Sequence, residues 1–265
     1  MSPLVNVAVA AARIGGDVII RSMNRVHNLK VETKGKNDFV TDVDKFVEAK
    51  IIESIKKSYP HHSFLGEESG STSGDEGGVE WIIDPIDGTT NFLHGFPAFC
   101  VSIAARHKGK MEAGVIYDPL RQELFTASRG QGAMLDERKI RVTTPSSLEG
   151  TLIGTGFPYR GDPEALDNYI NMFRDVSIKA AGIRRAGSAA LDLAYVACGR
   201  FDGFWESGLK IWDIAAGELI VREAGGLICD LDGQENHLKT GNVAAGSSKV
   251  LRDILKTLAP YTKAK

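Results

Sequence analysis

The segment of residues 84–92 reads DPIDGTTNF and contains the residue types of a metal and phosphate site. Proline and glycine favour a tight turn, so the carboxylates of Asp84 and Asp87 and the carbonyl of Ile86 could face one point. Oxygen ligands of this kind suit Mg²⁺, which needs only a few carboxylates beside a substrate phosphate. The alternative is an ordinary surface turn, because Asp, Pro and Gly are the residues that turns use.

The residues that follow could hold a phosphate next to such a metal. Gly88, Thr89 and Thr90 would present successive backbone N–H groups at the start of a helical turn. Backbone N–H groups in this arrangement bind anions. The sequence therefore allows metal and phosphate to meet at one place.

Two further carboxylates lie where they could join the site. Glu67 follows a predicted strand, and Asp213 begins a predicted helix within WDIAAG. Each has a simpler interpretation: Glu67 as a solvated loop carboxylate, and Asp213 as an N-terminal helix cap. Position alone does not decide between these interpretations.

The composition is that of an ordinary globular protein and excludes several classes. The chain has 265 residues, 43% of them hydrophobic and 25% charged, and a formal net charge of −2. That charge gives no reason to expect direct nucleic-acid or membrane-surface binding. Three cysteines are too few for a disulfide framework. Arg13 and Asp17 interrupt the apolar stretch of residues 5–20, which predicts an amphipathic helix of a cytoplasmic protein rather than a signal peptide or membrane span.

The elements that must position these residues predict a mixed α/β chain. A polar connection at Lys34–Asp38, expected to be mobile, leads to a helix whose N-cap is Thr41. Short strands with turns over 99–134 predict an antiparallel meander. Strands then alternate with helices beyond about residue 144, so we predict one unit, 1–265, of two packed halves, 1–143 and 144–265. Strands are expected to end at 65 and to span 79–83, 151–155, 182–186 and 203–206, and helices to end near 24 and to span 164–176, 188–198, 213–223 and 249–258.

The sequence closely resembles the inositol monophosphatase family over essentially its whole length, and within it is similar to the bacterial SuhB branch. The resemblance is carried by four segments, GEES at 66–69, WIIDPIDGTTNF at 81–92, GSAA at 187–190 and WDIAAGE at 212–218. The second and fourth match the two signature patterns of the family in order and separation. The resemblance implies a layered αβαβα fold and a homodimer.

Carried over to this chain, the resemblance implies a ligand set for two to three Mg²⁺ ions. Glu67, Asp84 and the Ile86 carbonyl would hold one ion, and Asp84, Asp87 and Asp213 a second. A third, weaker ion would share Glu67, which the resemblance also places among the catalytic residues. Two ions about 3.5 to 4 Å apart can clamp a phosphate while a water is activated for hydrolysis.

The resemblance further implies a proton-handling pair, Asp44 and Thr89. Asp44 lies in FVTDVD at 39–44, and its carboxylate would orient the Thr89 hydroxyl beside the attacking water. Without the family motif, Asp44 would be interpreted as a first-turn carboxylate that is favoured by the helix dipole.

Substrate contacts follow from the same resemblance. Ala189, through its backbone, and Glu206 match positions that hold inositol hydroxyls, and Asp213 does so alongside its metal. Arg184 stands where the family carries an arginine near the substrate, although a surface or interface arginine is the alternative. Lys210 replaces a histidine of animal members, a change that bears on polyol selectivity. The segment with Lys34 and Lys36 resembles the family's loop over the metal site.

The implied function is Mg²⁺-dependent, lithium-sensitive hydrolysis of myo-inositol 1-phosphate and related phosphate monoesters. One alternative is a related phosphatase for fructose 1,6-bisphosphate, a 3′-phosphonucleotide or histidinol phosphate, since these enzymes share the metal motif. Another is a regulatory protein of ribosomal-RNA transcription complexes. The sequence has no concentrated basic stripe, so that role would depend on protein partners.

Overall fold

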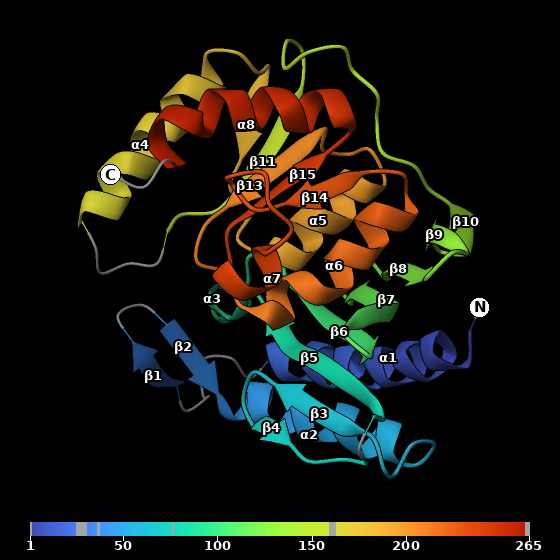
Figure 1. The fold of residues 1–265 in the computed structure, drawn as a ribbon. Coiled ribbons are helices and arrows are strands. Elements are labelled where there is room, and N and C mark those ends of the chain that lie inside the picture. The colour runs from blue at the N-terminus through green and yellow to red at the C-terminus, as the bar shows by residue number, and fades with distance from the viewer. Residues whose placement is uncertain (1, 25–30, 36–37, 76, 159–162, 263–265) are drawn as a thin grey trace.

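The protein has five layers, alternately helical and β-sheet, which confirms the predicted αβαβα arrangement (Figure 1). The computed structural model describes residues 2–24, 31–35, 38–75, 77–158 and 163–262.

The first sheet has eight strands in the order β10-β9-β8-β7-β6-β5-β3-β4. The strands from β5 to β10 are antiparallel to their neighbours, which confirms the predicted meander, whereas β3 and β5 run parallel. The strands are β3 (Ser63–Gly66), β4 (Gly70–Thr72), β5 (Val79–Asp87), β6 (Cys100–His107), β7 (Lys110–Asp118), β8 (Glu123–Ser128), β9 (Gly132–Leu135) and β10 (Arg138–Lys139).

Helices α1 (Pro3–Met23) and α2 (Asp42–Lys56) cover one face of the first sheet. By length and composition alone, α1 is apolar enough to cross a membrane. Its Val5, Ala8 and Ile19, however, are buried in one cluster with residues of α2 and the sheet. Packing against the sheet therefore accounts for the apolar face of α1.

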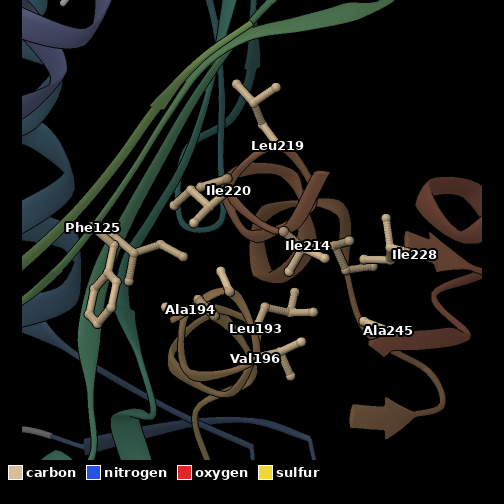
Figure 2. Close-up of a cluster of buried hydrophobic side chains, with 14 of the residues drawn as sticks. Phe125, Leu193, Ala194, Val196, Ile214, Leu219, Ile220, Ile228 and Ala245 are labelled. Atoms are coloured by element: carbon tan, nitrogen blue, oxygen red, sulfur yellow. The ribbon is translucent and has the colours of Figure 1, made fainter. Parts of the chain in front are cut away.

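Helices α5 (Ala189–Ala197) and α6 (Ile211–Glu223) form the middle layer, between the two sheets. Figure 2 shows Leu193 and Val196 of α5 and Ile214 of α6 between Phe125 of the first sheet and Ala245 of the second. Small residues let these elements approach closely. A Cβ on Gly114 of β7 would lie 2.8 Å from the Ala216 carbonyl oxygen of α6.

The second sheet has five strands in the order β12-β11-β13-β15-β14. Strand β11 runs parallel to β12 and β13, and β15 is antiparallel to both of its neighbours. The outer face of this sheet packs against α4 and α8. The elements are β11 (Leu152–Thr155), α4 (Pro163–Ser177), β12 (Gly182–Arg184), β13 (Gly203–Glu206), β14 (Leu227–Cys229), α7 (His237–Thr240), β15 (Val243–Gly246) and α8 (Ser248–Thr262).

The connection before α2 contains two strands where the sequence predicted a polar loop. Strands β1 (Val31–Gly35) and β2 (Asp38–Thr41) form an antiparallel hairpin with Glu32 opposite Val40. In β1 the β-branched Val31 and Thr33 alternate with charged residues, and β2 ends in the run Phe39–Thr41, residue types that favour strand pairing in spite of the charges. In Figure 1 this hairpin lies near α3 (Thr89–Leu93), and β2 contacts that helix.

Candidate active site

A bulge in β5 brings the first two carboxylates together. Asp84 pairs with Ser102 of β6, Asp87 pairs with Cys100, and the register shifts between these two pairs. The sequence predicted that the strand ends before Asp84 and is followed by a tight turn. In the structure β5 continues to Asp87, and a β-bulge within the strand takes the place of that turn. A bulge re-aims side chains, and Pro85 has no N–H to lose from the ladder.

Asp213 completes a cluster with these two aspartates. Carboxylate oxygens of Asp84, Asp87 and Asp213 all lie within 4.8 Å of one another. Asp213 comes from the first turn of α6, and its Oδ2 accepts a hydrogen bond from the Lys210 N–H at 2.7 Å. Asp213 is thus not the N-cap residue, which is Lys210, but its carboxylate accepts from the N-cap N–H and also belongs to the cluster.

Glu67 reaches the same cluster from the end of β3. Gly66 of β3 pairs with Ile83 of β5 in parallel, so the residues that follow them, Glu67 and Asp84, lie side by side. The Glu67 side chain is hydrogen-bonded to Asp84. The resemblance had placed Glu67, Asp84, Asp87 and Asp213 in one site, and the structure brings all of them together.

Crowded burial makes this cluster costly to ionise. Burial, and then the charges of Glu67, Asp87 and Asp213, raise the pKa of Asp84 well above its usual range. Burial and Asp87 raise the pKa of Asp213 to about 8. No described lysine or arginine side chain forms an ion pair with these three aspartates. A crowded set of oxygen donors fits a divalent cation, whose charge would offset the repulsion.

Asp87 is anchored on the second half of the chain. Its Oδ2 accepts hydrogen bonds from the Ser188 hydroxyl and the Ala190 N–H, both at 2.7 Å. The Ala189 N–H also faces this carboxylate. Asp87 therefore keeps Oδ1 for the cluster while Oδ2 joins the start of α5 to β5.

Asp44 and Thr89 meet on the other side of the bulge. The Thr89 hydroxyl donates to Asp44 Oδ1 at 3.0 Å and approaches the Ile86 carbonyl at 3.1 Å. Asp44 Oδ2 accepts from the Thr41 N–H and hydroxyl, at 2.8 and 2.6 Å. Burial raises the pKa of Asp44, and the hydrogen bonds from Thr41 oppose that rise. The predicted N-cap at Thr41 is confirmed.

Gly88 turns the chain from the bulge into α3. Its φ is +100°, and a Cβ there would lie 2.8 Å from the Ala98 carbonyl oxygen, so a side chain would be strained and obstructed. Helix α3 begins at Thr89, and Thr90 follows as an exposed residue. The first N–H groups of a helix have no partner within it. This arrangement is compatible with the predicted phosphate cradle.

The predicted substrate contacts differ in their burial and in their neighbours. Ala189 is buried at the start of α5, next to Asp87. Glu206 ends β13, and burial raises its pKa to about 8 against the opposing effect of Arg185. Arg184 is exposed on the edge strand β12 and donates to the carbonyl of Ile183. Of the two neighbouring arginines, it is Arg185 whose charge acts on Glu206.

The remaining predicted residues are the lysines Lys34, Lys36 and Lys210. Lys36 and the side chain of Lys34 lie outside the described residues. Lys210 is the N-cap residue of α6, directly before the turn that carries Asp213.

A model of the inositol monophosphatase family matches residues 1–263. The chain belongs to the inositol monophosphatase family. It is 51% identical over 264 residues to the "Nus factor SuhB" of Pseudomonas aeruginosa, an alignment that covers 98% of this chain and 97% of that one. The crystal structure of the suhB protein from Bartonella henselae superposes with a TM-score of 0.94 at 45% identity, covering 97% and 98% of the two chains. A structure of inositol monophosphate-bound SaIMPase-II matches at a TM-score of 0.80 and 28% identity, covering 98% and 95%.

Sequence reasoning missed residues that shape the site of this inositol monophosphatase family member. Ser188 holds Asp87, and the Asn91 side-chain N–H₂ donates to the carbonyls of Ala98 and Ala186, at 2.6 and 2.8 Å. Both lie inside the quoted family motifs, so the motifs were the signal. Ser188 lies 101 residues from Asp87, and Asn91 lies 95 residues from Ala186, so pattern alone does not pair them.

Proposed function

We propose that this protein is a Mg²⁺-dependent phosphatase that hydrolyses phosphate monoesters of small polyols, with myo-inositol 1-phosphate as the leading substrate. The observation that carries the proposal is the cluster of the buried Asp84 and Asp87 with the half-buried Asp213, beside the Asp44–Thr89 pair. The carboxylate cluster fits a divalent cation, and the Asp44–Thr89 pair fits a proton transfer.

The cluster would supply most ligands for two or three Mg²⁺ ions. Glu67, Asp84 and the Ile86 carbonyl would hold one ion, and Asp84, Asp87 and Asp213 another. Bound Mg²⁺ supplies charge that polarises the phosphate and lowers the pKa of water. Asp87 can serve because Ser188 and Ala190 use only its Oδ2.

Asp44 and Thr89 would handle the proton of the attacking water. The Thr89 hydroxyl donates to Asp44, so its oxygen is turned to accept a proton from water. As the water oxygen bonds to phosphorus, its proton passes to Thr89 and that of Thr89 to Asp44. The phosphorus–oxygen bond to the polyol then breaks with its electron pair left on the polyol oxygen, which takes a proton from a solvent water, while Asp44 returns its proton to solvent. This sequence of steps requires no phospho-enzyme.

The substrate would lie between the two halves. The N–H groups of Gly88, Thr89 and Thr90 would hold the phosphate. Glu206, Asp213 and the backbone of Ala189 would hold polyol hydroxyls, with Arg184 near the substrate. A relative at 28% identity whose structure contains inositol monophosphate supports a polyol substrate.

Phosphate release from a small panel tests this proposal. The panel contains inositol 1-phosphate, glycerol 2-phosphate, fructose 1,6-bisphosphate, 3′-phosphoadenosine 5′-phosphate and histidinol phosphate, each with and without Mg²⁺ and with lithium. We expect Mg²⁺-dependent, lithium-sensitive turnover that favours inositol 1-phosphate. A preference for another member would point to the related phosphatases, and no turnover on any would refute the proposal.

A second candidate function is a binding role in a transcription complex, in the cytoplasm. It is favoured by the name "Nus factor SuhB" of relatives at about 50% identity. The two functions separate in an Asp87→Asn variant, which should lose hydrolysis and keep protein binding. We further propose a homodimer, which sedimentation would test.

A further inference from the structure

Glu48 is a buried carboxylate that the proposed chemistry does not use. It lies on α2, one helical turn after Asp44, and only 2% of its surface is exposed. Residues four apart on a helix share one face, so α2 directs two carboxylates toward the site. A buried carboxylate requires hydrogen-bond donors to offset its desolvation.

The Glu48 carboxylate is occupied by the turn that carries Glu67. Its Oε2 accepts from the Glu68 N–H at 2.9 Å, and its Oε1 accepts from the Ser69 N–H at 2.8 Å. Hydrogen bonds to an ionised acceptor are about twice as strong as neutral ones. The Glu67 N–H itself donates to the Ile83 carbonyl of β5 at 3.1 Å. The backbone of this turn is therefore held from both sides.

Gly66 makes room for this contact. A Cβ at Gly66 would lie 2.4 Å from Glu48 Oε2 and 2.5 Å from its carboxyl carbon. Any side chain there would push the Glu48 carboxylate out of its position. Gly66 has no positive φ that would require glycine, so the close approach of Glu48 is the physical reason for glycine here.

We propose that Glu48 is a positioning residue that holds Glu67 at the carboxylate cluster and thereby sets the affinity of that cluster for a divalent cation. The inference rests on the proposed function, because it assumes that Glu67 is a ligand. Glu48 does not touch the cation or the substrate. Through α2 it also links the placement of Glu67 to that of Asp44, one turn earlier.

The test compares Glu48→Gln with Glu53→Gln, an exposed glutamate on the same helix. In Glu48→Gln the new side-chain amide would face one backbone N–H with its own N–H₂ group, so one hydrogen bond is lost. We expect Glu48→Gln to bind Mg²⁺ at least tenfold more weakly in calorimetric titration, with kcat at saturating Mg²⁺ reduced less than threefold. Glu53→Gln should match the wild type in both measurements.

Gly66→Ala displaces the same carboxylate from the other side and is the second variant, in case Glu48→Gln does not fold. It should weaken Mg²⁺ binding by a similar factor. The double variant Glu48→Gln with Gly66→Ala should bind Mg²⁺ little more weakly than either single variant. If Mg²⁺ affinity is unchanged in Glu48→Gln and in Gly66→Ala while Glu67→Gln weakens it, the proposed role of Glu48 is overturned. Unchanged affinity in Glu67→Gln would instead remove Glu67 from the ligand set and contradict the proposed function.

Discussion

The hydroxyl of Ser188 donates a 2.7 Å hydrogen bond to the carboxylate of Asp87, 101 residues earlier in the chain. This bond joins β5 of the first sheet to the start of α5 in the middle layer. Asp87 belongs to the carboxylate cluster, and the cluster member from the second half of the chain, Asp213, lies on α6 of the same middle layer. The site is therefore a product of tertiary structure rather than of either segment alone.

Replacing Ser188 with alanine should reveal what this bond contributes. A hydrogen bond to a charged group contributes about 1.5 to 3 kcal/mol to stability, and Ser188 is also the N-cap of α5. We expect a loss of about 2 kcal/mol in chemical denaturation and a fall in kcat of about tenfold to a hundredfold as Asp87 shifts. Ser177→Ala, at an exposed site, is the control. Wild-type kcat in Ser188→Ala would show that Asp87 needs no anchor.

The Asp44–Thr89 pair predicts different effects for two substitutions at one position. Thr89→Ala removes the hydroxyl that relays the proton, so kcat at saturating Mg²⁺ should fall about 10² to 10⁴-fold. Thr89→Ser keeps the hydroxyl and should stay within about tenfold of the wild type. Steady-state phosphate release measures both. Equal rates in the alanine and serine variants would exclude the relay.

The crowded carboxylates predict a trade-off between stability and metal binding. At pH 8.5 with chelator present, Asp84→Asn should melt a few degrees higher than the wild type, because one negative charge leaves a buried cluster. The asparagine Oδ1 can still accept from the Ile86 N–H. Added Mg²⁺ should stabilise the wild type and leave the variant nearly unchanged. A lower melting temperature of Asp84→Asn in chelator would contradict this account of the cluster.

Glu206 predicts how stability depends on pH in the metal-free protein. Its pKa is raised to about 8 by burial, above the ordinary value of 4.5. The folded state therefore holds a proton that the unfolded state has lost, and stability falls as pH rises from about 4.5 through 8. Glu206→Gln should gain about 1 to 3 kcal/mol over the wild type at pH 9 and little at pH 5. A gain equal at both pH values would show that titration of Glu206 is not the cause.

Much of the site could be predicted because its residues follow apolar runs or lie in the first turn of a helix. Glu67 follows β3, Asp84 follows the apolar part of β5, and parallel pairing of β3 with β5 puts these two positions side by side. Asp213 lies in the first turn of α6, where an acidic residue is favoured. The layered fold followed from the family resemblance and is confirmed.

The remainder depends on contacts that have no local pattern. β15 consists of Val243–Gly246, buried on both faces and rich in small residues, so no alternation marks it as a strand. The hairpin of β1 and β2 was not predicted, because the charged residues in this segment favoured a loop. Arg184 ends β12 and donates to the Ile183 carbonyl, whereas Arg185 follows the strand and lies over the Phe157 ring, and no sequence pattern distinguishes the two residues.

The most direct test of the central claim is phosphate release from inositol 1-phosphate over a range of Mg²⁺, compared between the wild type and Asp213→Asn. Asp213 is the carboxylate that the second half of the chain contributes to the cluster. We predict no turnover by the wild type in chelator, saturable activation by Mg²⁺, and at least a hundredfold lower rate in the variant. Wild-type turnover that is unaffected by chelator, or that survives in Asp213→Asn, would contradict the claim that this cluster is a Mg²⁺-dependent hydrolytic centre.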